Sequence, residues 1–224
     1  MEEKFKGIVI KVNEYKDADK LASIFSLEKG KLTAKFTGVK KDTAKFKAMA
    51  QPFTFAEFTT NKKGETRTVT SVDLIDNFSR ILSNYNKTIC GYIVLDMVKS
   101  LLATAKPEQD IFLLTLSSLK NIEQNEEFSA TIDYILKFIS FSGMDLQFPN
   151  SKFVYLDNFT GNFVAEHTQN STQIDKKVYE TLKKINANQL DEELNLNVLK
   201  QILRLLHNII FLKFNEDLKS FSFI

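Results

Sequence analysis

The N-terminal third of the chain alternates short apolar runs with polar turns. The runs are rich in β-branched and aromatic residues, and stretches such as KDADK, EKGK and NKKGE separate them. Five short strands within about 75 residues are typical of a small closed barrel, and an OB-type barrel fits that count. We expect the strands at residues 5–12, 21–27, 32–36, 52–60 and 67–74.

Further along the chain, apolar positions recur at intervals of three and four, which is the period of an amphipathic helix. The last helix is apolar over much of its circumference, which indicates a buried position. We therefore predict an α+β protein with an OB-fold domain at 1–75 and a mainly α-helical domain at 76–224. The expected helices cover residues 78–102, 108–119, 128–141, 178–185 and 194–214.

A β-hairpin is expected as an insertion between helices, at about 144–172. This stretch contains Pro149, Gly161 and two aromatic runs around a DNFTGN turn. It contains no cysteine, so we expect aromatic packing to hold it together. The aromatic side chains predicted to do so are Phe153, Tyr155, Phe159 and Phe163.

Composition excludes several classes of protein. The apolar fraction of 43% and the charged fraction of 26% are those of a globular protein. Apolar runs such as IIFL at 209–212 are far shorter than the roughly 20 residues that span a bilayer, and the start, MEEKFKG, is not typical of a secretory signal. Cys90 is the only cysteine, so an intrachain disulfide is impossible. We expect a cytoplasmic protein.

Enzyme motifs are missing from the sequence. There is no P-loop, GxGxxG, GxSxG or HExxH pattern. His167 and His207 lie far apart without ligand spacing, and Cys90 lies in an apolar helix pattern, typical of a core residue. We therefore expect no catalysis, no cofactor and no bound metal.

Positive charge is concentrated in the predicted barrel. Residues 1–75 contain 15 Lys and Arg against 10 Asp and Glu, whereas the rest of the chain contains 15 against 18. Lys31 and Lys35 fall four residues apart on one strand, so both point to the same side, opposite Leu32, Ala34 and Phe36. Further lysines follow in the next loop, with Phe46 between two of them.

A basic strand face that continues into a basic loop with an aromatic residue is how OB-folds bind a nucleic-acid backbone and stack its bases. The alternative is a solvated surface whose lysines only keep it soluble. The residues predicted to face nucleic acid are Lys31, Lys35, Lys40, Lys41, Lys45, Phe46 and Lys47.

The N-terminal sequence contains GIVIKVNEYKDADKL at 7–21, a GKL turn at 30–32, GVKK at 38–41 and QPF at 51–53. These motifs resemble those of the RecO family of bacterial recombination mediators. Its pattern is G-x-V-[IL]-x4-Y-x-[ED]-x-[DS]-x-[LI], then a G-x-[LI] turn, A-[KR]-G-[AV]-[KR] and [LQ]-[QE]-P-[FL]. The tail LRLLHNIIFLKFNEDLKS resembles the last helix of the family and its L-K-S end. The matching residues are Gly7, Val9, Tyr15, Asp17, Asp19, Leu21, Gly30, Lys31, Leu32, Gly38, Val39, Lys40, Lys41, Gln51, Pro52, Phe53, Leu218, Lys219 and Ser220.

The resemblance implies a DNA repair and recombination mediator associated with the nucleoid. Family members bind single- and double-stranded DNA through the OB domain and anneal complementary strands. With RecR they load RecA onto DNA coated by single-strand binding protein, whose acidic C-terminal tail binds the helical domain. RecF is a further partner to consider, and we expect a monomer when the protein is free. By matching position, Lys31, Lys35, Lys40 and Lys41 would face DNA.

One departure from the family pattern is clear. Many members carry a CxxC...CxxC zinc site in the hairpin, whereas residues 148–171 contain no cysteine here, so this hairpin would be a zinc-ribbon remnant. Two alternatives stay open: an OB-fold module that binds RNA, and a scaffold of the same pathway that has lost DNA binding along with its zinc site.

Overall fold

The computed structural model describes residues 1–40, 46–103, 106–124, 126–189 and 194–224. The chain forms two compact units, the first from Met1–Ser83 and Leu95–Ser117 and the second from Asn84–Val94 and Ser118–Ile224. Helices α1 (Tyr85–Leu101) and α2 (Gln109–Glu123) each contribute residues to both units.

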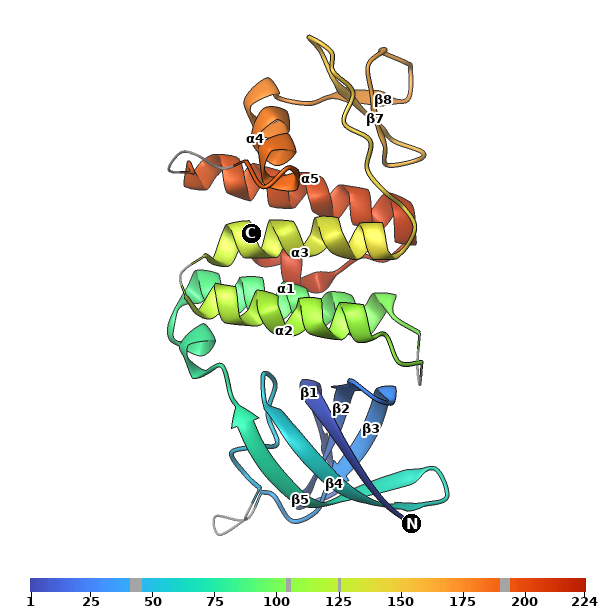
Figure 1. Cartoon of the computed structure of the whole chain (residues 1–224), viewed down its shortest axis with the longest axis vertical. Helices are drawn as coiled ribbons and strands as arrows, with labels where there is room; N and C mark the ends of the chain where they lie inside the picture. Colours follow the sequence, from blue (N-terminus) through green and yellow to red (C-terminus); the bar gives the residue numbers. More distant parts are fainter. Residues whose placement is uncertain (41–45, 104–105, 125, 190–193) are drawn as a thin grey trace. The chain divides into compact units, whose positions relative to one another are not determined.

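The first unit contains a closed five-stranded barrel (Figure 1). Its strands neighbour one another in the order β1-β2-β3-β5-β4, and β1 also pairs with β4. Every pairing is antiparallel except that of β3 with β5, which joins Lys35 to Thr68. The predicted five-stranded OB-type barrel is confirmed. The strands are β1 (Glu2–Tyr15), β2 (Asp19–Ser26), β3 (Gly30–Phe36), β4 (Phe55–Lys63) and β5 (Thr66–Asp76).

β1 pairs with two neighbours and has a register shift. Before the shift, which lies between Val9 and Lys11, β1 pairs with β4 from Glu2 to Ile8 and with β2 from Gly7 to Val9; after it, β1 pairs with β2 alone as far as Tyr15. Val9 holds the shift in place, because its N–H donates to the Thr54 carbonyl at 2.8 Å and its carbonyl accepts from the Phe53 N–H at 3.0 Å. A bulge of this kind bends a strand and changes where the following side chains point.

Residues of all five strands fill the barrel interior. Aromatic rings lie at its centre, where the Phe58 ring centroid is 5.8 Å from that of Phe5 and 6.3 Å from that of Phe36. Side chains from outside the strands complete the core, among them Val39 and Ala50. The strand residues of this core are Phe5, Val9, Ala22, Ile24, Leu32, Ala34, Phe36, Ala56, Phe58, Val69 and Val72.

The helical part of the first unit covers one end of the barrel's outer surface. Phe112 of α2 packs on Phe25 of β2, with ring centroids 5.4 Å apart, and on Phe55 of β4 at 6.1 Å. Gly30, the first residue of β3, lies directly against the backbone of Lys106. These contacts bury side chains that point out of the barrel, so one end of its outer surface is unavailable to a ligand.

The first predicted helix is wrong at its start. The pattern indicates a helix from Phe78, but residues Ser79–Ser83 form a short 3₁₀ helix, η1, and α1 begins only at Tyr85. The Asn84 side-chain oxygen accepts hydrogen bonds from the backbone N–H groups of Asn86 at 2.9 Å and Lys87 at 3.2 Å. This is the geometry of an N-cap, and it sets the beginning of the helix.

Three helices dominate the second unit: α3 (Glu127–Phe141), α4 (Lys176–Asn186) and α5 (Leu196–Phe214). α5 carries seven buried residues and packs against both α3 and α4, which confirms its predicted buried position. Asp175 and Asn195 cap the N-termini of α4 and α5 with their side-chain oxygens. The short helix η2 (Lys219–Phe223) follows α5. Within the described residues, no helix combines the length and the apolar character that crossing a bilayer would require.

The predicted hairpin is present and has a third strand. β6 (Tyr155–Asp157) lies between β7 (Phe163–Val164) and β8 (Ser171–Gln173), all antiparallel. Phe163 is buried in a cluster with Phe148 and Tyr179, with ring centroids 5.3 to 5.9 Å apart, and the Tyr179 hydroxyl donates to the Pro149 carbonyl at 2.8 Å.

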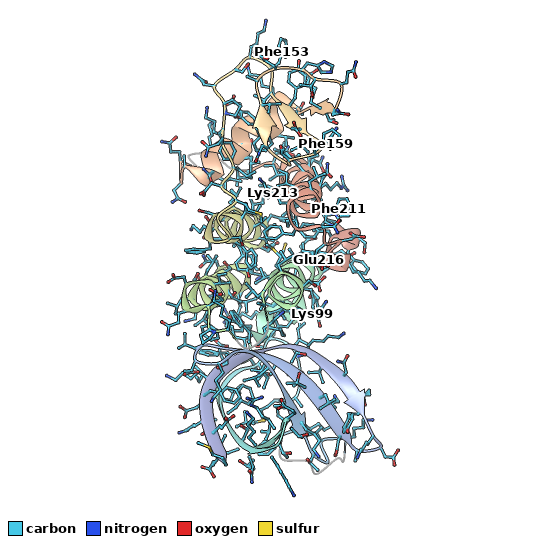
Figure 2. All side chains as sticks on the ribbon, turned by 90° about the vertical axis from the view of Figure 1, so that its right-hand side faces the viewer. Lys99, Phe153, Phe159, Phe211, Lys213 and Glu216 are labelled. Carbon is cyan, nitrogen blue, oxygen red and sulfur yellow. The ribbon has the colours of Figure 1, made fainter. Side chains whose placement is uncertain are left out.

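Two of the four aromatic residues predicted to hold the hairpin do not do so. Phe153 is 49% exposed and Phe159 is 73% exposed, and Figure 2 shows both labelled side chains at the surface of this part of the chain. Phe159 lies in the β6–β7 turn, whose backbone N–H groups are hydrogen-bonded by the Asp157 carboxylate. The period-two pattern does not hold in a turn, so the ring is left in solvent.

Candidate nucleic-acid interface

Strand register places outward-facing residues of β1, β2 and β3 in rows across the barrel. Lys11 of β1 pairs with Ser23 of β2, which pairs with Thr33 of β3. Two residues further along, the next row consists of Asn13, Leu21 and Lys35. We call these two rows the lysine face. Rows on one face of a strand are separated by two residues, or about 6.6 Å.

Lys31 lies two residues before Thr33 on β3, at the end of the barrel that contacts Lys99 and Lys106. Its ammonium nitrogen donates a hydrogen bond to the backbone carbonyl of Lys99, 2.5 Å away in the last turn of α1. Burial lowers the pKa of the Lys31 ammonium, and the nearby charge of Lys99 lowers it further. Lys31 points outward as predicted, but it contacts the end of a helix of its own chain.

Lys11 and Lys35 point out of the barrel from β1 and β3. Lys11 is exposed and Lys35 is half-buried, and no ion pair between described residues engages either ammonium group. The sequence pattern did not single out Lys11. The direction in which the Lys11 side chain points depends on the register shift after Val9. Its distance from Lys35 depends on how β1, β2 and β3 pair.

Lys40 sits beside the turn that joins β1 to β2. Its ammonium forms an ion pair with Glu14 at 2.5 Å and donates to the Lys16 carbonyl at 3.3 Å, while its backbone N–H donates to the Ala18 carbonyl at 3.2 Å. The hydrogen bond from Lys40 lowers the pKa of the Glu14 carboxyl. These contacts hold Lys40 against Lys16 in the turn. The sequence pattern did not indicate that these two lysines are neighbours.

The remaining residues predicted to face nucleic acid are Phe46, Lys47, Lys41 and Lys45. Phe46 is half-buried and packs against the barrel core, and its carbonyl accepts from the N–H groups of Met49 and Ala50. This gives Phe46 a packing role, and we leave it out of the proposed interface. Lys47 is exposed. Lys41 and Lys45 lie outside the described residues.

Two models of one protein family together match nearly the whole chain. Residues 1–78 match the model described as "Recombination protein O N terminal", and residues 82–220 match "Recombination protein O C terminal". The chain belongs to the RecO family. It is therefore a RecO-family DNA repair protein with an N-terminal OB-type barrel.

Similar proteins include several that carry the name DNA repair protein RecO. The one from Caldicellulosiruptor saccharolyticus is 27% identical over 241 aligned residues, which cover 99% of this chain and 98% of the relative. Alignment with the protein from Desulfitobacterium hafniense gives 29% identity over 137 residues, 61% of this chain and 50% of the relative. For Clostridium novyi the identity is 28% over 148 residues, 65% of this chain and 57% of the relative.

The cysteine and both histidines of the chain pack against neighbouring side chains or are buried. Cys90 is buried, and burial raises the pKa of its thiol to about 12, so the reactive thiolate is disfavoured. His207 stacks on Phe221 and forms an ion pair with Asp217 at 3.0 Å when its ring is protonated. His167 packs edge-on against Tyr155. Across the described ranges, no three His, Cys, Asp or Glu residues are grouped so as to hold a metal ion.

Proposed function

We propose that this RecO-family protein binds single- and double-stranded DNA with the lysine face of its barrel. The observation that carries the proposal is the pair Lys11 and Lys35, two lysines on the outward face of β1–β3 in an OB-type barrel. The face formed by strands 2 and 3 of such barrels is the usual site for oligonucleotides. The two rows run side by side, about 6.6 Å apart.

Binding at this face is expected to be electrostatic. Each lysine that neutralises a phosphate releases condensed counterions, so the affinity falls as salt is added. Residues Ser23 and Thr33 add hydroxyl groups between the lysines, and these can donate to phosphate oxygens. None of these contacts reads a base edge, so little sequence preference is expected.

The later steps of the proposal follow from the family resemblance. We propose that the protein anneals complementary strands, binds the acidic C-terminal tail of single-strand binding protein through its helical residues, and with RecR promotes loading of RecA at the nucleoid. RecF would be a further partner. The steps are tested by following RecA assembly on DNA coated with single-strand binding protein, with and without RecR and this protein.

The DNA contact is tested with a double variant, Lys11→Glu with Lys35→Glu. Fluorescence anisotropy of a labelled oligo-dT would be measured between about 50 and about 200 mM salt. The wild type should bind and weaken with salt, whereas the variant should lose about tenfold or more in affinity and show a shallower salt dependence.

The matched control is Lys176→Glu with Lys177→Glu, which makes the same change in net charge in the first turn of α4. Acidic residues are favourable at a helix N-terminus, so this control should fold and should bind like the wild type. Equal binding by both double variants would contradict the proposed face. Tighter binding of oligo-rU than of oligo-dT would favour the RNA-binding alternative, and binding of RecR without binding of DNA would favour the scaffold.

A further inference from the structure

Tyr15 is the one aromatic side chain with an exposed ring among the described residues of the barrel. It is 36% exposed. The phenylalanines of strands β1 to β5 are all buried in the barrel or under α2, and Phe46 packs against the core. Leu74 and Ile75 of β5 are also exposed, but Tyr15 alone offers a flat ring among the described barrel residues.

The position of Tyr15 continues the lysine face. Tyr15 pairs with Asp19 across β1 and β2, which places it two residues beyond the row that contains Asn13 and Lys35. It is also the last residue before the β1–β2 turn, and in OB-type barrels this turn borders the oligonucleotide site. An extended strand lying across Lys11 and Lys35 would therefore reach the ring next.

Several contacts hold the turn beside Tyr15 in one conformation. The Asp19 carboxylate accepts a hydrogen bond from the Gly38 N–H at 2.8 Å, and the Lys40 backbone N–H donates to the Ala18 carbonyl. The Lys16 ammonium lies 5.5 Å from the centre of the Tyr15 ring, which is cation–π geometry. The ammonium takes one face of the ring, so a base that stacks would take the opposite face.

We propose that Tyr15 is a base-stacking residue that makes the lysine face prefer unpaired strands to duplex. The inference rests on the proposed DNA binding and deepens it. Lysine ammonium groups bind phosphates, which both kinds of strand carry, whereas only an unpaired base presents its flat face for stacking. Stacking is tolerant of sequence because every base has such a face.

The test compares a labelled oligo-dT with an oligomer of equal length that has abasic sugars throughout, using the full chain and anisotropy. Tyr15→Ala should weaken binding of oligo-dT by about five- to hundredfold, the range that one stacked base contributes. Binding of the abasic oligomer should not change. Tyr15→Phe keeps the ring and should restore oligo-dT binding. Tyr85→Ala removes a tyrosine that is 66% exposed on α1 and serves as the control.

A second readout reports stacking directly. An oligonucleotide with 2-aminopurine should lose fluorescence when it binds the wild type or Tyr15→Phe, and it should keep its fluorescence with Tyr15→Ala. The inference is overturned if Tyr15→Ala binds oligo-dT like the wild type, or if it weakens both oligomers equally. If the wild type binds neither oligomer, the proposed DNA binding itself fails, and that result is distinct from either of the others.

Discussion

The ammonium group of Lys31 donates a hydrogen bond to the backbone carbonyl of Lys99, in the last turn of α1. Carbonyls in the last turn of a helix lack a partner within the helix, and the Lys31 ammonium satisfies one of them with a hydrogen bond. Lys35 lies four residues along the same strand face but has no such contact with α1 among the described residues. Two lysines that look equivalent in the sequence therefore have different surroundings.

Lys31→Met and Lys35→Met should separate these two environments. Methionine keeps the apolar stem and removes the charge. We expect Lys31→Met to lower the free energy of unfolding by about 1 kcal/mol, the usual contribution of such a hydrogen bond, with little change in DNA affinity. Lys35→Met should leave stability within about 0.5 kcal/mol of the wild type and weaken DNA binding. Urea unfolding and anisotropy of labelled oligo-dT measure the two effects; the reverse pattern would contradict the assignment.

Gly30 and Gly38 should respond differently to alanine, although both have a positive φ, +68° and +69°. A Cβ at Gly30 would lie 2.3 Å from the Lys106 carbonyl oxygen, whereas one at Gly38 would meet nothing within 4 Å. Gly38→Ala should cost about 1 kcal/mol of unfolding free energy, from backbone strain alone. Gly30→Ala should cost about 3 kcal/mol or more, because strain and overpacking add. Equal costs in urea unfolding would show that the approach of Lys106 is not as close as described.

Truncating a buried ring beside the sheet of β6, β7 and β8 should destabilise the protein more than truncating an exposed ring there. Phe163→Ala removes a buried ring that packs on Phe148 and Tyr179, and it should cost about 3 to 5 kcal/mol of unfolding free energy. Phe159→Ala removes a ring that is 73% exposed, and it should cost no more than about 0.5 kcal/mol. Thermal unfolding and proteolysis of residues 144–175 are suitable measurements.

A chelator test accompanies the aromatic variants. If packing alone holds the small sheet, incubation with EDTA should leave the midpoint of thermal unfolding unchanged. A fall in the midpoint that added zinc reverses would instead indicate a metal site, and the packing explanation would then be wrong.

The Cys90 thiol should be unreactive in the folded protein. Burial raises its pKa to about 12, so almost none is thiolate at about pH 8, where an exposed cysteine reacts readily. Iodoacetamide should therefore modify Cys90 only after unfolding in urea, as judged by the mass of the intact protein. The raised pKa also means that the folded state loses stability as the pH rises above the ordinary thiol value of about 8.5, since the unfolded chain then ionises first. Rapid modification under native conditions would contradict the buried position.

Local patterns predicted most of the fold because periodicity reflects which side faces a core. The alternation in GKLTAKF is that of β3 as observed, with Leu32, Ala34 and Phe36 inside. The buried α5 follows from its apolar circumference in the same way. The pattern failed at Phe78, where the N-cap Asn84 delays the helix, because capping depends on a side-chain hydrogen bond that periodicity does not contain.

The candidate interface was predictable only in part. The sequence indicated a basic face on β3 and named Lys35, but it grouped Lys31 with it and omitted Lys11 and Tyr15. The DNA contacts of all these residues stay predictions. Phe46 illustrates the same limit, because an aromatic between two lysines has the same local pattern whether it packs on the core or stands in solvent.

The sequence by itself determined the succession of a five-stranded barrel and a helical part, the placement of positive charge in the N-terminal third, and the family, because these depend on residue types and their spacing. Only the tertiary structure decided which outward-pointing side chains are exposed. The Lys31 ammonium is hydrogen-bonded to the end of α1, whereas the register shift after Val9 brings Lys11 and Tyr15 onto the same surface as Lys35. Exposure depends on contacts between residues far apart in the chain, and a local pattern does not contain them.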